Sequence, residues 1–204
     1  MSGKPGRAVA QASLVLGSAS PRRRELLEMQ SIRLQVRSPS VDETARPNEA
    51  PTVYLERIVS AKLEAVARDL EPGVHAFGIV VADTVVTIGA EILGKPRDRD
   101  DSLHMLQRLS GITHEVLTRF AIGALDGKLL HAETVTTKVT FRTLTDLEQT
   151  HYVATGEGDD KAGAYAVQGR GAAFVSKIDG SYANVVGLPI CELMVALARL
   201  GFAA

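Results

Sequence analysis

The sequence predicts an α/β fold built on an elongated, mixed sheet flanked by helices. Apolar runs typical of buried strands alternate with segments whose apolar residues recur at helical spacing. The middle of the chain, residues 114–143, is instead β-rich and contains the turn signal "DGK", which suggests antiparallel strands. The 204 residues suffice for one sizeable core. We therefore expect a single domain over 13–204, preceded by a flexible tail over 1–12.

The first half of the chain is expected to alternate strands and helices. Ser20 followed by Pro21 is a typical helix start, because a serine hydroxyl caps free backbone N–H groups and proline suits the first helical position. The run "FGIVVADTVVTIGAEIL" is expected to form a strand, an acidic corner at Asp83 and a hairpin closed near Gly89. The other expected elements are strands over 14–17 and 34–38, a polar loop over 39–51 and a helix over 52–70.

The second half is expected to contain the longest strands. These lie over 114–125 and 128–144. Around them we expect helices over 97–111, over 145–156 with a threonine cap, and over 188–200, and a glycine-punctuated strand and loop over 161–182.

Composition excludes several classes of partner. Lys plus Arg total 23 against 24 for Asp plus Glu, so the net charge of -1 predicts no strong field for nucleic acid or an anionic membrane. No apolar stretch approaches the roughly 18 residues that span a bilayer. The single cysteine, Cys191, lies in an apolar run and is expected to be a buried, inert thiol, which fits a reducing, cytoplasmic compartment.

The stretch "GSASPRRREL" (17–26) predicts an anion site. The backbone N–H groups at a helix N-terminus favour an anion, and Ser18, Ser20, Arg22 and Arg23 add donors. Arginines in a first turn lie at the unfavourable end of the helix dipole, so three in a row favour a bound phosphate. The motif is neither a P-loop nor a dinucleotide-binding loop.

Acids, lysines and a glycine-rich loop are further candidates. Asp83 follows a buried run, and Glu43 lies in a polar loop; both could bind Mg²⁺ together with substrate phosphates. Taken alone, Asp83 fits a turn-initiating aspartate equally well, whereas Glu43 is better explained as a solvated loop acid, and Lys62 and Lys95 as surface lysines. The loop "DKAGAYAVQGRG" surrounds Lys161 and Gln168 with small residues, which lets backbone approach a ligand closely.

Together these pieces resemble the Maf family of nucleoside triphosphate pyrophosphatases. The matching motifs run in order from about residue 14 to 200: "SASPRRRELL", "VDET", "SAKLEAV", "ADTVV", "ILGKPRD", "THEV", "DKAGAYAVQGRGAAFVSKIDGSY" and "VVGLPI". The resemblance implies an elongated α/β fold with a cleft between two lobes, similar to the inosine triphosphate pyrophosphatases. It also implies homodimers, although no feature of the sequence requires them.

The resemblance further implies hydrolysis of a nucleoside triphosphate to the monophosphate and pyrophosphate with a divalent metal, Mg²⁺ or Mn²⁺. Asp83 matches the catalytic carboxylate, as base or metal ligand, and Glu43 the second acid and metal ligand. The matched lysines are Lys62 and Lys95, and the matched phosphate-binding residues are Ser18, Arg22 and Arg23.

The loop "DKAGAY" with a glutamine in "QG" is similar to the family branch that acts on dTTP and UTP. Arg22, Thr84 and Gln168 match the positions tied to this specificity, and we add Lys161 to the binding residues. A Gln amide donates and accepts hydrogen bonds, so it can face a uracil edge. Two alternatives stay open: a nucleotide-binding regulator of cell division or septum formation, and a nucleotidyltransferase.

Overall fold

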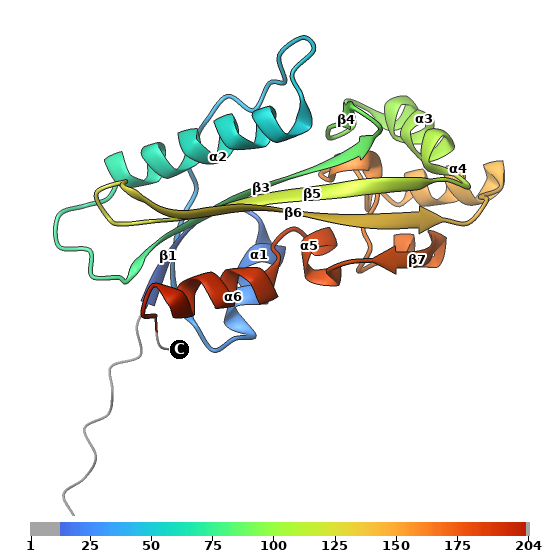
Figure 1. The fold of residues 1–204 in the computed structure, drawn as a ribbon. Helices are drawn as coiled ribbons and strands as arrows, with labels where there is room; N and C mark the ends of the chain where they lie inside the picture. Colours follow the sequence, from blue (N-terminus) through green and yellow to red (C-terminus); the bar gives the residue numbers. More distant parts are fainter. Residues whose placement is uncertain (1–12, 203–204) are drawn as a thin grey trace, which may run out of the picture.

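The protein, described over residues 13–202 by a computed structural model, is built on one seven-stranded sheet flanked by helices (Figure 1). The strands are β1 (Ser13–Gly17), β2 (Arg33–Arg37), β3 (Gly78–Ile88), β4 (Glu91–Leu93), β5 (Thr113–Gly123), β6 (Leu129–Phe141) and β7 (Val175–Asp179). Their order is β2-β1-β3-β5-β6-β7, with β4 paired to β3. The predicted tail over 1–12 lies outside the described residues.

The sheet is mixed, as the sequence predicted. β1 pairs in parallel with β2 and β3, whereas the pairs β3–β5, β5–β6 and β6–β7 are antiparallel. Figure 1 shows β3, β5 and β6 as long strands that run through the molecule and give it an elongated shape. The long β-rich runs and the "DGK" turn therefore lie where the sequence placed them.

Helices cover both faces of the sheet. They are α1 (Pro21–Glu28), α2 (Pro51–Arg68), α3 (Arg99–Leu109), α4 (Asp146–Ala154), α5 (Tyr182–Val186) and α6 (Ile190–Arg199), with short 3₁₀ turns at η1 (Ala162–Ala164) and η2 (Arg170–Phe174). On β1, Val15 packs with α2, whereas Leu14 and Leu16 pack with α6. This alternation follows from the two-residue period of a strand, so one strand supports both layers.

A third core lies where α3 and α4 meet the far end of the sheet. Leu106 and Leu109 of α3 and Tyr152 of α4 pack against Phe141 of β6. The ring centroids of Phe141 and Tyr165 lie 4.8 Å apart with the rings nearly perpendicular. The core therefore includes part of the glycine-rich loop that the sequence singled out, and fixes its position.

Local signals account for the element boundaries that matter most for the site. Ser20 caps α1 by accepting from the backbone N–H of Arg23, and Pro21 occupies the first turn. Thr145 and Glu148 form a complete capping box at α4. Gly89, with φ of 62°, allows the tight turn between β3 and β4.

Two expectations are wrong. Asp83 is not at a corner: β3 continues through it to Ile88, and Asp83 pairs with Arg119 of β5 in mid-strand. Cys191 is exposed, because α6 turns Leu193 and Leu197 toward the sheet and leaves Cys191 on the opposite side. In the described chain, no helix is long and apolar enough to cross a membrane.

Candidate active site

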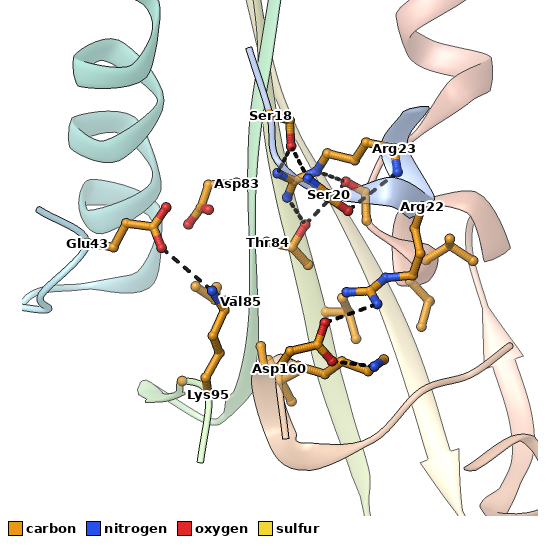
Figure 2. A pocket seen from close by; sticks show the side chains of 18 of the residues that line it. Ser18, Ser20, Arg22, Arg23, Glu43, Asp83, Thr84, Val85, Lys95 and Asp160 are labelled. Atoms are coloured by element: carbon orange, nitrogen blue, oxygen red, sulfur yellow. Dashed lines mark hydrogen bonds and ion pairs between the residues drawn. The ribbon is translucent and has the colours of Figure 1, made fainter. Parts of the chain in front are cut away.

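A cavity of about 620 Å³ opens where the β1–α1 junction, α2, β3 and the loop around η1 meet. Figure 2 shows the Asp83 and Glu43 carboxylates on one side of this cavity and the paired side chains of Arg22 and Asp160 on the other. All of the residues that the sequence singled out line its wall: Ser18, Arg22, Arg23, Glu43, Lys62, Asp83, Thr84, Lys95, Lys161 and Gln168.

The two neighbouring arginines of α1 point in different directions. Arg22 lies at the cavity, where its Nη1 is 3.6 Å from Oδ2 of Asp160 (Figure 2). Arg23 is turned inward and is 8% exposed. Successive residues on a helix point about 100° apart, so one arginine is left for a ligand and the other enters the fold.

Arg23 joins three separate segments beneath the cavity. Its Nε donates to the Gly187 carbonyl at 2.8 Å and its Nη1 to the Ala82 carbonyl at 2.8 Å. Nη1 also donates to Ser18 Oγ at 3.3 Å, and Nη2 to Thr84 Oγ1 at 3.0 Å. Four of the five guanidinium N–H groups are thus satisfied by protein. Burial lowers the pKa of Arg23, opposed by the charges of Asp83 and Glu43.

Ser18 keeps a free hydrogen-bond donor at the cavity. Its Oγ accepts from the Ser20 N–H at 3.2 Å and from Arg23 at 3.3 Å. Both lone pairs are then used, while the hydroxyl hydrogen has no acceptor in the described part of the chain. This hydrogen suits an anionic oxygen in the cavity.

Lys62 lies between the two acids. Its Nζ is 2.6 Å from Glu43 Oε1 and 2.7 Å from Asp83 Oδ1, and the residue is only 6% exposed. Lys95 Nζ lies 4.0 Å from Glu43 Oε2 and is largely exposed. Burial raises the pKa of Glu43, but the hydrogen bond and charge of Lys62 outweigh it and hold this pKa below its usual value. Lys62 is therefore not the surface lysine that its sequence position alone suggests.

The acidic loop is held by α2. The Tyr54 hydroxyl donates to the Glu43 carbonyl at 3.0 Å, and Arg57 donates to the Thr44 carbonyl at 3.0 Å. Tyr54 was not among the predicted site residues, yet its spacing of eight residues from Lys62 places both on one face of the helix.

The opposite rim is formed by the loop before η1. The Lys161 ammonium donates to the Glu157 carbonyl and to the Asp160 carboxylate. The carboxylate of Glu157 in turn accepts from Tyr152 and from the backbone N–H groups of Arg170 and Gly171. Gln168 is exposed at the cavity, and its amide makes no hydrogen bond within residues 13–202. Asp160 was not among the predicted site residues either, although it directly precedes Lys161.

The two acids fit a hard divalent cation. Lys62 contacts one oxygen of each, and among the described residues no hydrogen bond reaches Glu43 Oε2 or Asp83 Oδ2. No group of three or more His, Cys, Asp or Glu side chains that could hold a metal occurs in the part of the chain described. Two carboxylates suit Mg²⁺, which completes its shell with substrate phosphates and water.

Comparison with known proteins identifies the family. A family model described as "Maf-like protein" matches residues 13–200. A Citrifermentans bemidjiense protein named dTTP/UTP pyrophosphatase is 47% identical over 190 residues, covering 93% of this chain and 96% of that protein. A Hahella chejuensis protein of the same name is 44% identical over 201 residues, covering 98% and 96%.

Among solved structures, the Staphylococcus aureus Ham1 protein aligns with a TM-score of 0.47 at 13% identity, covering 92% of this chain and 98% of that chain. The family assignment rests on the sequence matches alone. With the family model spanning nearly all of the described residues and relatives near half identical over most of their length, the chain belongs to the Maf-like protein family.

Proposed function

We propose that this chain hydrolyses dTTP and UTP, and modified pyrimidine nucleoside triphosphates, to the nucleoside monophosphate and pyrophosphate. One observation carries the proposal. The two acids Glu43 and Asp83, linked by a buried lysine, line the same cavity as the cations of Arg22 and Lys161. Such a cavity offers acids for a water molecule and cations for a polyphosphate. The names of the relatives support the same reaction.

In the proposed reaction, water attacks the α-phosphorus while Asp83 orients it and accepts its proton. The bond from the α-phosphorus to the oxygen bridging to the β-phosphorus breaks, and its electron pair leaves with pyrophosphate. Burial raises the pKa of Glu43, but the hydrogen bond and charge of Lys62 lower it and favour the anionic form of this acid. Lys95, Arg22, Lys161 and the Ser18 hydroxyl bind the phosphates, while Arg23 positions the residues around them.

Glu43 and Asp83 would hold a divalent metal, Mg²⁺ or Mn²⁺, and the bound ion would offset charge on the phosphates. Gln168 would read the pyrimidine, since its exposed amide both donates and accepts.

A nucleotide panel with Mg²⁺ or Mn²⁺ tests the proposal. We expect pyrophosphate, without any acceptor substrate, and fastest release from dTTP and UTP. In ¹⁸O-labelled water the label should enter the monophosphate. Orthophosphate as first product, or label in pyrophosphate, contradicts the proposed bond cleavage. A requirement for a sugar-phosphate acceptor would indicate a nucleotidyltransferase.

The variant Asp83→Asn separates catalysis from binding. We expect it to bind nucleotide and to lose hydrolysis. A cellular effect on division that survives in this variant would instead assign the chain a binding role.

A further inference from the structure

A buried line of polar groups runs from the cavity wall into the sheet. Thr84 of β3 lines the cavity, and Thr118 of β5 lies opposite it in register. The two hydroxyl oxygens are 2.9 Å apart, and Thr118 Oγ1 is 3.1 Å from the Asn184 carbonyl oxygen of α5. Thr118 is completely buried and does not touch the cavity.

The hydrogen bonds around Thr84 fix the direction of its proton. A threonine hydroxyl has one hydrogen and two lone pairs. Arg23 Nη2 donates to Thr84 Oγ1 at 3.0 Å, so one lone pair is occupied. Because the hydrogen of Thr118 goes to the Asn184 carbonyl, the hydrogen between the two threonines comes from Thr84.

The alternative arrangement also binds the Thr84 hydrogen within the protein, but it occupies both lone pairs of Thr84. If Thr118 donates to Thr84, the Thr84 hydrogen turns to the Gly187 carbonyl, 3.4 Å away. This arrangement gives up the 3.1 Å bond from Thr118 to Asn184 and uses a longer one. In both arrangements the Thr84 hydrogen is bound within the protein, and the favoured one leaves Thr84, which lines the cavity, one lone pair without a donor among the described residues.

We propose that Thr118 is a positioning residue that makes the Thr84 hydroxyl an acceptor only, so that the site favours substrates that donate a hydrogen bond there. This inference rests on the proposed function, since a nucleotide must occupy the cavity. The donor is either the imide N–H of uracil or thymine or the 3′-hydroxyl of the sugar, both of which UTP and dTTP share. If the imide is read, cytosine is disfavoured, because its ring nitrogen at the same position is an acceptor and would face the Thr84 lone pair.

The test compares Thr118→Val with Thr118→Ser. Valine keeps the shape but removes the hydroxyl, which leaves the Thr84 hydrogen without its nearest acceptor. We expect Thr118→Val to lower the ratio of kcat/KM for UTP over CTP roughly tenfold when the imide is the donor, the effect of about one hydrogen bond. Thr118→Ser restores the hydroxyl and should keep the wild-type ratio.

Substrate analogues identify the donor. On the wild-type enzyme we expect a loss of about tenfold in kcat/KM either with 3-deaza-UTP, which lacks the imide N–H, or with 3′-deoxy-UTP, which lacks the 3′-hydroxyl. The same analogue should lose its disadvantage in Thr118→Val. A purely structural role for Thr118 would lower kcat/KM for every substrate alike and leave the ratios unchanged.

Several outcomes overturn the inference. If the wild-type enzyme hydrolyses every analogue with the same kcat/KM as UTP, it recognises no hydrogen-bond donor at Thr84. This result does not depend on whether a variant folds. The inference is also overturned if Thr118→Val is folded and keeps the wild-type ratios of kcat/KM between UTP and CTP and between UTP and each analogue. Wild-type enzyme that releases no pyrophosphate from UTP or dTTP instead refutes the proposed function.

Discussion

The Lys62 ammonium lies 2.7 Å from Oδ1 of Asp83, inside the fold and not on its surface. The same nitrogen is 2.6 Å from Glu43, so a single cation links two carboxylates from a loop and a strand. An isolated charge is costly to bury, and here the ammonium lies within ion-pair distance of both carboxylates. The three charged groups are therefore paired with one another beside a cavity that would bind a polyphosphate.

Replacing Lys62 by methionine should shift the pH dependence of hydrolysis. Without the lysine, the pKa of Glu43 should rise, because burial, which raises it, remains, and of the groups that lower it only the charges of Lys95 and Arg23 are left. As the pH falls, Glu43 is then protonated earlier, so the acid limb of the kcat/KM profile should move to higher pH. We also expect kcat/KM at neutral pH to fall about 100-fold.

The control for this variant is Lys128→Met in the turn between β5 and β6, outside the cavity. It should keep the wild-type profile. An unchanged acid limb in Lys62→Met, measured on enzyme shown to be folded by circular dichroism, would contradict the role assigned to Lys62.

Replacing Arg23 by lysine should destabilise the fold. Lysine lacks the planar fork that reaches the Gly187, Ala82 and Thr84 oxygens together. We expect the free energy of unfolding in urea to fall by about 3 kcal/mol, the scale of lost hydrogen bonds to a buried charge. Arg24→Lys is the matched control: Arg24 is exposed and pairs with the exposed Glu28, so its unfolding midpoint should stay at the wild-type value. Wild-type stability of Arg23→Lys with lost activity would make Arg23 a direct substrate ligand.

The sequence predicts the elements well where the signal is local. The Ser20 cap, the Thr145 capping box and the long β-rich runs depend on neighbouring residues, and each appears in the structure. Asp83 was misplaced because a carboxylate in an apolar run is normally at a strand end, where it avoids burial. Its partner Lys62 lies 21 residues away on α2, and no local pattern reveals that pairing.

The sequence also did not predict in which direction several helical side chains point. Arg22 and Arg23 are adjacent in the sequence, yet one lies at the cavity and the other is buried. Cys191 lies in an apolar run, yet α6 presents it on the side away from the sheet. In each case the helix is present as expected, but its rotation is set by distant strands. The sequence motifs predicted residues that line the cavity. The hydrogen bonds beneath the cavity could be identified only from the structure.

Replacing Asp160 by asparagine should tighten substrate binding. The Asp160 carboxylate pairs with Arg22 and Lys161, two cations that line the cavity, and it would compete with substrate phosphates for them. Since ion pairs this exposed contribute up to about 1 kcal/mol, we expect KM for dTTP to fall by about two- to fivefold. Asp159→Asn makes the same change of charge one residue away and should leave KM unchanged. A raised KM in Asp160→Asn would show that the ion pair is needed to hold the loop in place.

His114 is a buried titratable group near the cavity that the proposed reaction does not use. It is 1% exposed, its Nε2 lies 2.9 Å from the Tyr165 hydroxyl oxygen, and its Nδ1 has no partner within residues 13–202. Tyr165 lines the cavity beside the loop that carries Gln168. Burial lowers the pKa of His114 from 6.5 to about 4, so the folded state holds this ring neutral.

The pH dependence of stability should report this histidine. Between about pH 6.5 and pH 4 the unfolded chain binds a proton that the folded chain does not, so acidification favours unfolding. We expect His114 to account for a loss of up to about 3 kcal/mol as the pH falls through this range. His114→Gln keeps a polar partner for Tyr165 without titrating, so its unfolding free energy in urea should vary less with pH, even if it is lower at pH 7. His104→Gln, an exposed change on α3, should keep the wild-type slope. Equal slopes for His114→Gln and the wild type would mean that His114 is protonated in the folded state or reaches solvent.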